Sequence, residues 1–131
     1  MDDPKHFKVV FLGESYVGKT VLIDSFFNGY FSNTSYTTSS PSYKTKTIKH
    51  GNKNYNFDLW DTSGYVSYRS ITKIFLKVVN IIVLVYDTTK EYTFLELDYW
   101  INTILTQNNP EVSFILVGNK SDLYENILYL I

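Results

Sequence analysis

The sequence contains no cysteine and no long apolar run, and its charges are almost balanced. Without cysteine, a disulfide framework, a thiolate metal site and prenyl or palmitoyl attachment to this chain are excluded. The longest apolar run, residues 81–86, is far too short to span a bilayer, and residues 1–6 lack the apolar core of a signal peptide. These absences favour a cytoplasmic protein that would need something outside these residues to attach to a membrane.

Length and charge narrow the function classes further. With 131 residues, the chain has room for a single domain, which we assign to residues 1–131. Lysine and arginine number 12 against 13 acidic residues, so the net charge of -1 provides no electrostatic argument for binding nucleic acid. Any binding of phosphate groups must therefore depend on a local arrangement of residues.

Such an arrangement is present near the N-terminus. Residues 13–20, GESYVGKT, match the phosphate-binding pattern G-x-x-x-x-G-K-[S/T]. Residues 7–12 are rich in β-branched and aromatic side chains and predict a buried strand, whereas residues 21–27 have the apolar spacing of a helix. The alternative is a glycine-bearing turn that binds nothing. The position of the motif between a strand and a helix favours the phosphate loop.

The chemistry of this loop follows from its position. Backbone N–H groups at a helix N-terminus form a concavity that favours an anion. Lys19 adds a full charge for the outer phosphates, and Thr20 adds a hydroxyl for Mg²⁺. The residues predicted to contact the phosphates are Gly13, Ser15, Tyr16, Val17, Gly18, Lys19, Thr20 and Val21.

The rest of the chain predicts an α/β fold. Its patterns indicate a polar loop over residues 32–42, a hairpin of residues 43–49 and 55–59, a weak helical pattern over 65–79, a buried strand over 81–86, an amphipathic helix over 91–106 and a buried strand over 112–117. Because strands and helices alternate and several strands are uninterrupted apolar runs, we expect a mostly parallel sheet with helices on both faces.

Three polar clusters follow predicted strands. They come after the strands that end near Leu12, Trp60 and Val117. In parallel sheets of this kind, ligands bind beyond the carboxyl ends of the strands. The sequence therefore predicts that the three clusters meet at one edge of the sheet.

These stretches resemble the small GTPases of the Ras superfamily, and within it the Rab branch, especially Golgi-associated Rabs. The matching segments are residues 7–20, 59–62, 68–71, 83–88 and 116–123. The resemblance implies a P-loop NTPase fold of the G-domain type. It also implies that the chain is incomplete, since the last strand, the last helix and the lipidated tail of the family have no counterpart before Ile131. Residues 112–117 would then form an exposed edge of the sheet.

Residues 119–122, Asn-Lys-Ser-Asp, resemble the guanine-reading motif of the family. The Asp122 carboxylate would accept hydrogen bonds from the ring N–H and the exocyclic amine of guanine, a donor pair that adenine lacks. Asn119 would bind the other edge of the base and tie the loops together, and the stem of Lys120 would lie over the ring. Phe31 matches the aromatic residue that packs on guanine, and on its own it is equally compatible with a core position. On its own, the tetrapeptide is equally compatible with an ordinary polar turn.

The resemblance also implies a magnesium site and a mobile loop. Asp61 and Gly64 match the DxxG element, in which the carboxylate reaches Mg²⁺ through a water and the Gly64 N–H contacts the γ-phosphate. Thr38 is the best match to the threonine that closes on the metal and the γ-phosphate, with Thr37 as the adjacent alternative. The implied metal ligands are Thr20, Thr38 and Asp61.

The sequence departs from the family at a position important for hydrolysis. Tyr65 occupies the place of the glutamine that orients the attacking water, and Val66 replaces the acidic residue that follows. The catalytic positions carried over are therefore Lys19, Gly64 and, in altered form, Tyr65. The aromatic triad that Rabs present to effectors corresponds to Tyr43, Trp60 and Phe75, for which the alternative is a place in the core, the more frequent one for aromatic residues beside a sheet.

The function implied is a GTP/GDP-binding switch in vesicle traffic, with Mg²⁺ as cofactor and slow hydrolysis of GTP. Its partners would be effectors, exchange factors and GTPase-activating proteins, with no nucleic acid. A lipidated tail, absent from this chain, would place it peripherally on Golgi or endosomal membranes. The alternatives are a nucleotide-binding pseudo-GTPase that serves as a scaffold, and an incomplete product that does not fold.

Overall fold

The computed structural model describes residues 3–31, 42–62, 76–107 and 109–126. Its elements, in chain order, are β1 (Lys5–Leu12), α1 (Lys19–Asn28), β2 (Ser42–His50), β3 (Lys53–Asp61), β4 (Ile81–Asp87), α3 (Glu91–Leu95), α4 (Leu97–Leu105), β5 (Ser113–Asn119) and the 3-10 helix η2 (Ser121–Asn126). The helical pattern predicted for residues 65–79 lies outside the described residues except for its last four.

The strands form one mostly parallel sheet in the order β2-β3-β1-β4-β5. β1 runs parallel to β3 and β4, and β4 runs parallel to β5. The hairpin partner β2 is antiparallel to β3. This arrangement confirms the predicted α/β fold, and it brings the carboxyl ends of β1, β3, β4 and β5 to the same edge of the sheet.

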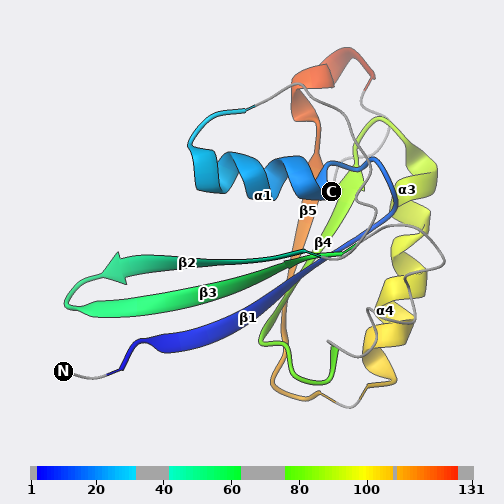
Figure 1. Ribbon diagram of the computed structural model, residues 1–131. Coiled ribbons are helices and arrows are strands. Elements are labelled where there is room, and N and C mark those ends of the chain that lie inside the picture. The colour runs from blue at the N-terminus through cyan, green and yellow to red at the C-terminus, as the bar shows by residue number, and fades with distance from the viewer. Residues whose placement is uncertain (1–2, 32–41, 63–75, 108, 127–131) are drawn as a thin grey trace.

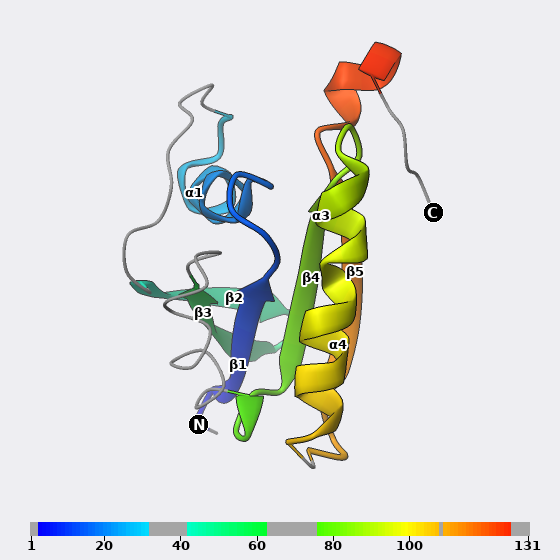
Figure 2. The same ribbon diagram turned by 90° about the vertical axis from the view of Figure 1, so that its right-hand side faces the viewer.

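Helices cover both faces of the sheet (Figures 1 and 2). On one face, Ile23 of α1 packs in a cluster with apolar side chains of β1, β3 and β4. On the other face, Leu97, Trp100 and Ile104 of α4 join the opposite row of side chains from β1 and β4. The strict alternation of side chains along β1 and β4 thus supplies two cores, one for each helical layer.

The helix predicted over residues 91–106 is divided at Glu96. The backbone of Glu96 keeps right-handed helical angles, with φ of -64° and ψ of -17°. The Tyr99 N–H, however, donates to the Glu96 carbonyl at 3.2 Å, a tighter turn than the α-helical one. The prediction of one continuous helix was therefore wrong, because a tight turn at Glu96 separates α3 from α4. Among the helices of the described segments, none is long and apolar enough to cross a membrane.

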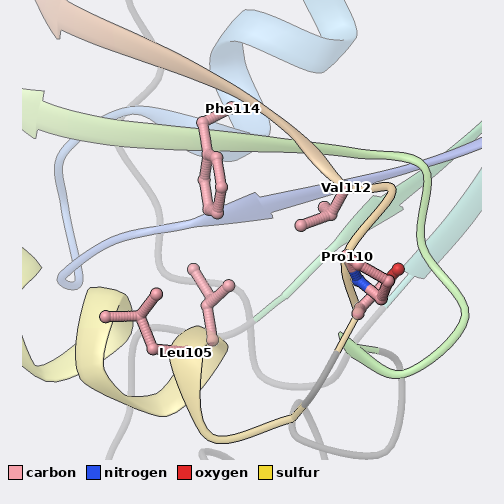
Figure 3. A pocket seen from close by; sticks show the side chains of 6 residues that line it. Leu105, Pro110, Val112 and Phe114 are labelled. Carbon is pink, nitrogen blue, oxygen red and sulfur yellow. The ribbon is translucent and has the colours of Figure 1, made fainter.

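Strand β5 is much more exposed than its apolar sequence predicts. Phe114, Ile115 and Leu116 are 50%, 48% and 45% exposed, because β5 is the outermost of the strands on its side of the sheet that the structure describes. The prediction of a buried strand over residues 112–117 was wrong, whereas the prediction of an exposed edge is confirmed. Beside this edge lies a cavity of about 470 Å³, shown in Figure 3 and lined by Ile104, Leu105, Asn109, Pro110, Val112 and Phe114.

Candidate functional site

The loop after β1 leads directly into the N-terminus of α1. Gly18 occupies the N-cap position with a φ of 99°, and no side chain caps the helix. A Cβ atom at Gly18 would lie 2.3 Å from Asn119 Nδ2, so any side chain here would displace that of Asn119 at the end of β5. The first backbone N–H groups of α1 are therefore left for a ligand, and a helix N-terminus of this kind favours an anion.

Lys19 is buried beneath this loop, with 6% of its surface exposed. Its Nζ donates to the carbonyl oxygens of Gly13 and Glu14, both at 2.9 Å. Burial lowers the pKa of the Lys19 ammonium to about 8, although the charges of Asp61 and Glu14 act in the opposite direction. An anion beside Nζ would stabilise the charged form, as a bound phosphate group requires.

Thr20 and Asp61 meet at the carboxyl ends of β1 and β3. The Thr20 hydroxyl donates to Asp61 Oδ2 at 2.5 Å, and Asp61 is 3% exposed. The next residue, Thr62, donates from Oγ1 to the Phe11 carbonyl at 2.6 Å and so joins the end of β3 to β1. A hydroxyl and a carboxylate from distant parts of the sequence thus come together, as predicted for two of the metal ligands.

The predicted guanine-reading motif follows β5 and contacts the phosphate loop. Asn119 donates from Nδ2 to the Val17 carbonyl at 2.8 Å, and Lys120 donates from Nζ to the Tyr16 carbonyl at 2.7 Å. Tyr16 and Lys120 both have left-handed backbone angles, with φ of 65° and 67°. These two bonds hold the motif against the phosphate loop, although the bonded residues are more than 100 positions apart in the sequence.

A cavity of about 350 Å³ lies between this motif and the helix that follows the phosphate loop. It contains Phe31 and Asp122, the residues predicted to stack on and to read the base. The complete lining comprises Val21, Leu22, Ser25, Phe31, Asn119, Lys120, Ser121 and Asp122. Phe31 is 66% exposed, so it is not a core residue, which was the alternative for this position.

Four predicted site residues lie outside the described residues: Thr38 with its alternative Thr37, Gly64 and Tyr65. Phe75, the third member of the aromatic triad, also lies there. The other two members are adjacent, since the rings of Tyr43 and Trp60 are 4.7 Å apart between centroids. Tyr43 is 50% exposed and therefore accessible to a partner.

Comparison with protein families matches residues 8–128 to the Ras family. The chain belongs to the Ras family. Its curated relatives include the Ras-related protein RabG2 of Dictyostelium discoideum, 36% identical over 128 residues that make up 98% of this chain and 65% of RabG2. The Ras-related protein SEC4 of Saccharomyces cerevisiae is 36% identical over 121 residues, 92% of this chain and 56% of SEC4. The Ras-related protein Rab-25 of Canis lupus familiaris is 37% identical over 119 residues, 91% of this chain and 56% of Rab-25.

These relatives agree with the resemblance to the Rab branch. The chain spans 56% to 65% of their length. The mostly parallel sheet of five strands, with helices on both faces, is the fold expected for a P-loop GTPase of this family.

Asp87 belongs to none of the motifs predicted from the sequence, although it joins β4 to the candidate site. Its Oδ2 lies 2.9 Å from Lys120 Nζ, and its Oδ1 accepts hydrogen bonds from the N–H and the hydroxyl of Thr89 at 2.8 and 2.6 Å. Burial alone would raise the pKa of the Asp87 carboxyl, but the bonds from Thr89 and Lys120 together hold it below its ordinary value. Its position at the end of a buried strand was the available signal, because Asp61 ends β3 in the same way.

We expect Asp87→Asn to destabilise this Ras-family domain by about 2 kcal/mol at pH 7, because the buried charge-assisted bonds to Lys120 and Thr89 are weakened. The folded-state pKa of Asp87 is lowered, so its stabilising contribution is present above the unfolded value of 3.8 and is lost as the pH falls through the folded value. Denaturant unfolding of both proteins at several pH values measures the difference, which should shrink below about pH 4.

Asp98→Asn is the matched control, since it makes the same change at an exposed position of α4. It should alter the free energy of unfolding by less than about 0.5 kcal/mol at every pH. A loss for Asp87→Asn that is the same in acid as at neutral pH would show that the charge of Asp87 is not the cause.

Proposed function

We propose that this chain is the nucleotide-binding part of a Rab-like GTP/GDP switch in intracellular vesicle traffic. The observation that carries the proposal is the single cavity in which Phe31 and Asp122 lie together, beside a phosphate loop bound to Asn119 and Lys120. A base placed in this cavity would have its phosphates at the N-terminus of α1. Three polar clusters were predicted to meet at this edge of the sheet. In the proposed site, they bind the base, the phosphates and the metal of one ligand.

Mg²⁺ fits the residues present. The Thr20 hydroxyl and the Asp61 carboxylate offer the hard oxygen atoms that Mg²⁺ prefers, and they lie next to the Lys19 ammonium. Within the described segments, no group of three or more His, Cys, Asp or Glu residues could hold a metal ion. That composition suits Mg²⁺ bound jointly with a nucleotide, because this ion usually takes only one or two protein ligands along with substrate phosphates. When bound, Mg²⁺ would neutralise charge on the phosphate oxygens.

The first experiment identifies the nucleotide. The purified protein is denatured, the released nucleotide is identified by chromatography, and the emptied protein is then titrated with GTP, GDP and ATP in the presence and absence of Mg²⁺. We expect guanine nucleotides to copurify, and we expect GTP and GDP to bind far more tightly than ATP. Equal affinity for GTP and ATP would contradict the guanine assignment.

We also propose that hydrolysis of GTP is slow. Catalysis of phosphoryl transfer depends on a positioned water and on stabilisation of charge, and a glutamine can hold that water with one donor and one acceptor. A phenol, as in Tyr65, is longer than the glutamine side chain and carries a single hydroxyl in place of the separate donor and acceptor of the amide. Binding should not suffer from this change, because Lys19, Thr20 and Asp122 are retained. The alternative, a pseudo-GTPase that acts as a scaffold, would bind GTP in the same way and hold it unhydrolysed.

Tyr65→Gln separates these possibilities. We expect the variant to hydrolyse GTP about tenfold faster than the wild type in single-turnover measurements, because the glutamine restores the orientation of the attacking water. Tyr92→Gln makes the same substitution at an exposed position of α3 and should leave the rate unchanged. If all three proteins turn over at one slow rate, Tyr65 is not the limiting residue, and if none turns over, the scaffold alternative is favoured.

The cellular part of the proposal rests on the Rab relatives. The exposed Tyr43 and its neighbour Trp60 would form part of an effector surface, and exchange factors and GTPase-activating proteins would control the nucleotide state. A location on Golgi or endosomal membranes would require a lipidated tail of the kind the family carries. Retention of an effector on the GTP-loaded but not the GDP-loaded protein would test this part.

A further inference from the structure

The outer part of the β2–β3 hairpin and the start of β1 project together beyond the end of α1 (Figure 1). We call these two segments, residues 44–54 and 5–8, the basic arm. They contain six lysines, both histidines and no acidic residue: Lys5, His6, Lys8, Lys44, Lys46, Lys49, His50 and Lys53. The rest of the chain carries the other six basic residues against all 13 acidic residues. The near-zero net charge therefore conceals an excess of positive charge on the arm, of which Asp58 and Asp24, paired with His6 and Lys44, offset only a part.

Two of the lysines bind α1. Lys44 Nζ lies 2.6 Å from Asp24 Oδ1, and Lys46 Nζ donates to the Phe26 carbonyl at 3.0 Å. Lys46 Nζ also lies 4.5 Å from the centre of the Phe26 ring. These contacts attach the part of the arm nearest to α1, residues 44–46, to the C-terminal half of that helix.

The other four lysines of the arm, Lys5, Lys8, Lys49 and Lys53, are exposed. In the part of the chain that the structure describes, they take part in none of the ion pairs. Apolar side chains accompany them. Ile48 is 37% exposed near the tip, and Phe7 stacks on Phe57 and lies beside Tyr55 at ring distances of 5.6 and 6.2 Å.

The chemistry of the basic arm favours an extended anionic surface over a shaped acidic peptide. All its fixed charges are lysines, which act as flexible point charges, whereas arginine is the residue suited to bidentate recognition of individual carboxylates or phosphates. Neither cavity described above includes a residue of the arm, and the hairpin projects outward. We propose that the basic arm docks on the anionic headgroups of a lipid bilayer.

This docking would orient the domain. Lys5, at the start of β1 and of the arm, is about 25 Å along the strand from the phosphate loop, because a strand rises about 3.3 Å per residue. The carboxyl edge of the sheet, with the candidate nucleotide site, would then point away from the bilayer and stay accessible to partners. The contact belongs to the folded domain itself and requires no lipid attached to the chain. Because no residue of the arm lines the candidate nucleotide cavity, the proposal does not depend on the proposed nucleotide binding.

Binding to vesicles tests the proposal. The 131-residue protein is sedimented with phosphatidylcholine vesicles, with and without 30% phosphatidylserine, at low and high salt. Each lysine near an anionic surface changes the partition coefficient by about fivefold, so Lys49→Glu/Lys53→Glu should lower it by at least about 25-fold. The matched control is Lys77→Glu/Lys90→Glu, which changes the net charge equally at two exposed positions outside the arm.

We expect the wild type and the control pair to bind phosphatidylserine vesicles in low salt, and the arm variant to remain in solution. Circular dichroism and nucleotide affinity should be the same for all three proteins, which separates a loss of docking from a loss of folding. The proposal is overturned by equal losses in both double variants, which would indicate an effect of net charge alone, or by equal binding to neutral vesicles. Retention on poly-glutamate without vesicle binding would also overturn it and would indicate an acidic protein partner.

Discussion

Asp122→Asn is expected to lower the affinity for GTP by about 100-fold and to raise the affinity for xanthosine triphosphate. The Asp122 carboxylate only accepts hydrogen bonds, which matches the two adjacent donors of guanine. An asparagine amide presents one donor and one acceptor. It therefore leaves one donor of guanine facing another donor, whereas it suits xanthine, which has a carbonyl in place of the exocyclic amine.

The structure supports this test because Asp122 lies in the wall of the 350 Å³ cavity and not in the core. The substitution should therefore leave the fold intact, which the melting temperature checks. Competition among GTP, ATP and xanthosine triphosphate gives the preference of each protein, with Asp98→Asn as the control for the same change elsewhere. An unchanged order of the three nucleotides in Asp122→Asn would remove the reason for assigning guanine to this cavity.

The order and type of the described elements could be predicted from the sequence because they depend on local patterns. The apolar runs of β1 and β4 are buried on both faces, and the alternation along the hairpin gives β2 and β3. The phosphate loop was predictable for the same reason, since its glycines and Lys19 are close in sequence. In these segments, local propensity and the final packing agree.

Burial of β5 could not be predicted in this way. Its central residues, FILV, are as apolar as the IIVLV run of β4, yet its side chains are much more exposed. What differs is the number of neighbouring strands and helices, which is a property of the whole sheet and not of the strand itself. A short apolar run indicates that a strand is able to be buried, but its position in the sheet decides whether it is.

The electrostatic core of the site was only partly predictable. Lys120 was expected to serve the base through its stem, but in the structure its ammonium joins Asp87 to the Tyr16 carbonyl. This link connects β4, β5 and the phosphate loop, which are far apart in sequence. The signal for Asp87, a carboxylate directly after a buried strand, was visible but became meaningful only when the sheet order placed β4 between β1 and β5.

Gly18→Ala is expected to reduce nucleotide affinity by about 100-fold, although it adds a single methyl group. The new Cβ would lie 2.3 Å from Asn119 Nδ2, so the Asn119 side chain would have to leave the Val17 carbonyl, its partner at 2.8 Å. The loop that holds the phosphates and the motif that reads the base would then lose their direct connection. Competition with a fluorescent guanine nucleotide measures the loss.

Gly29→Ala is the matched control, because Gly29 also has a positive φ, 78°, but a Cβ there would meet nothing within 4 Å. Both substitutions should cost about 1 kcal/mol of folding stability from the strained backbone, and only Gly18→Ala should impair nucleotide binding. The same loss of affinity in both variants would show that backbone strain, and not contact with Asn119, is responsible.

A double-mutant cycle then locates the effect. If Gly18→Ala acts by displacing Asn119, combining it with Asn119→Ala should cost little more affinity than Asn119→Ala alone, since the side chain that clashes is already absent. Fully additive losses would mean that the methyl group disturbs the phosphate loop by itself. Non-additivity is the expected result, because Asn119 Nδ2 is the nearest atom to the added methyl group and also the donor that joins β5 to the loop.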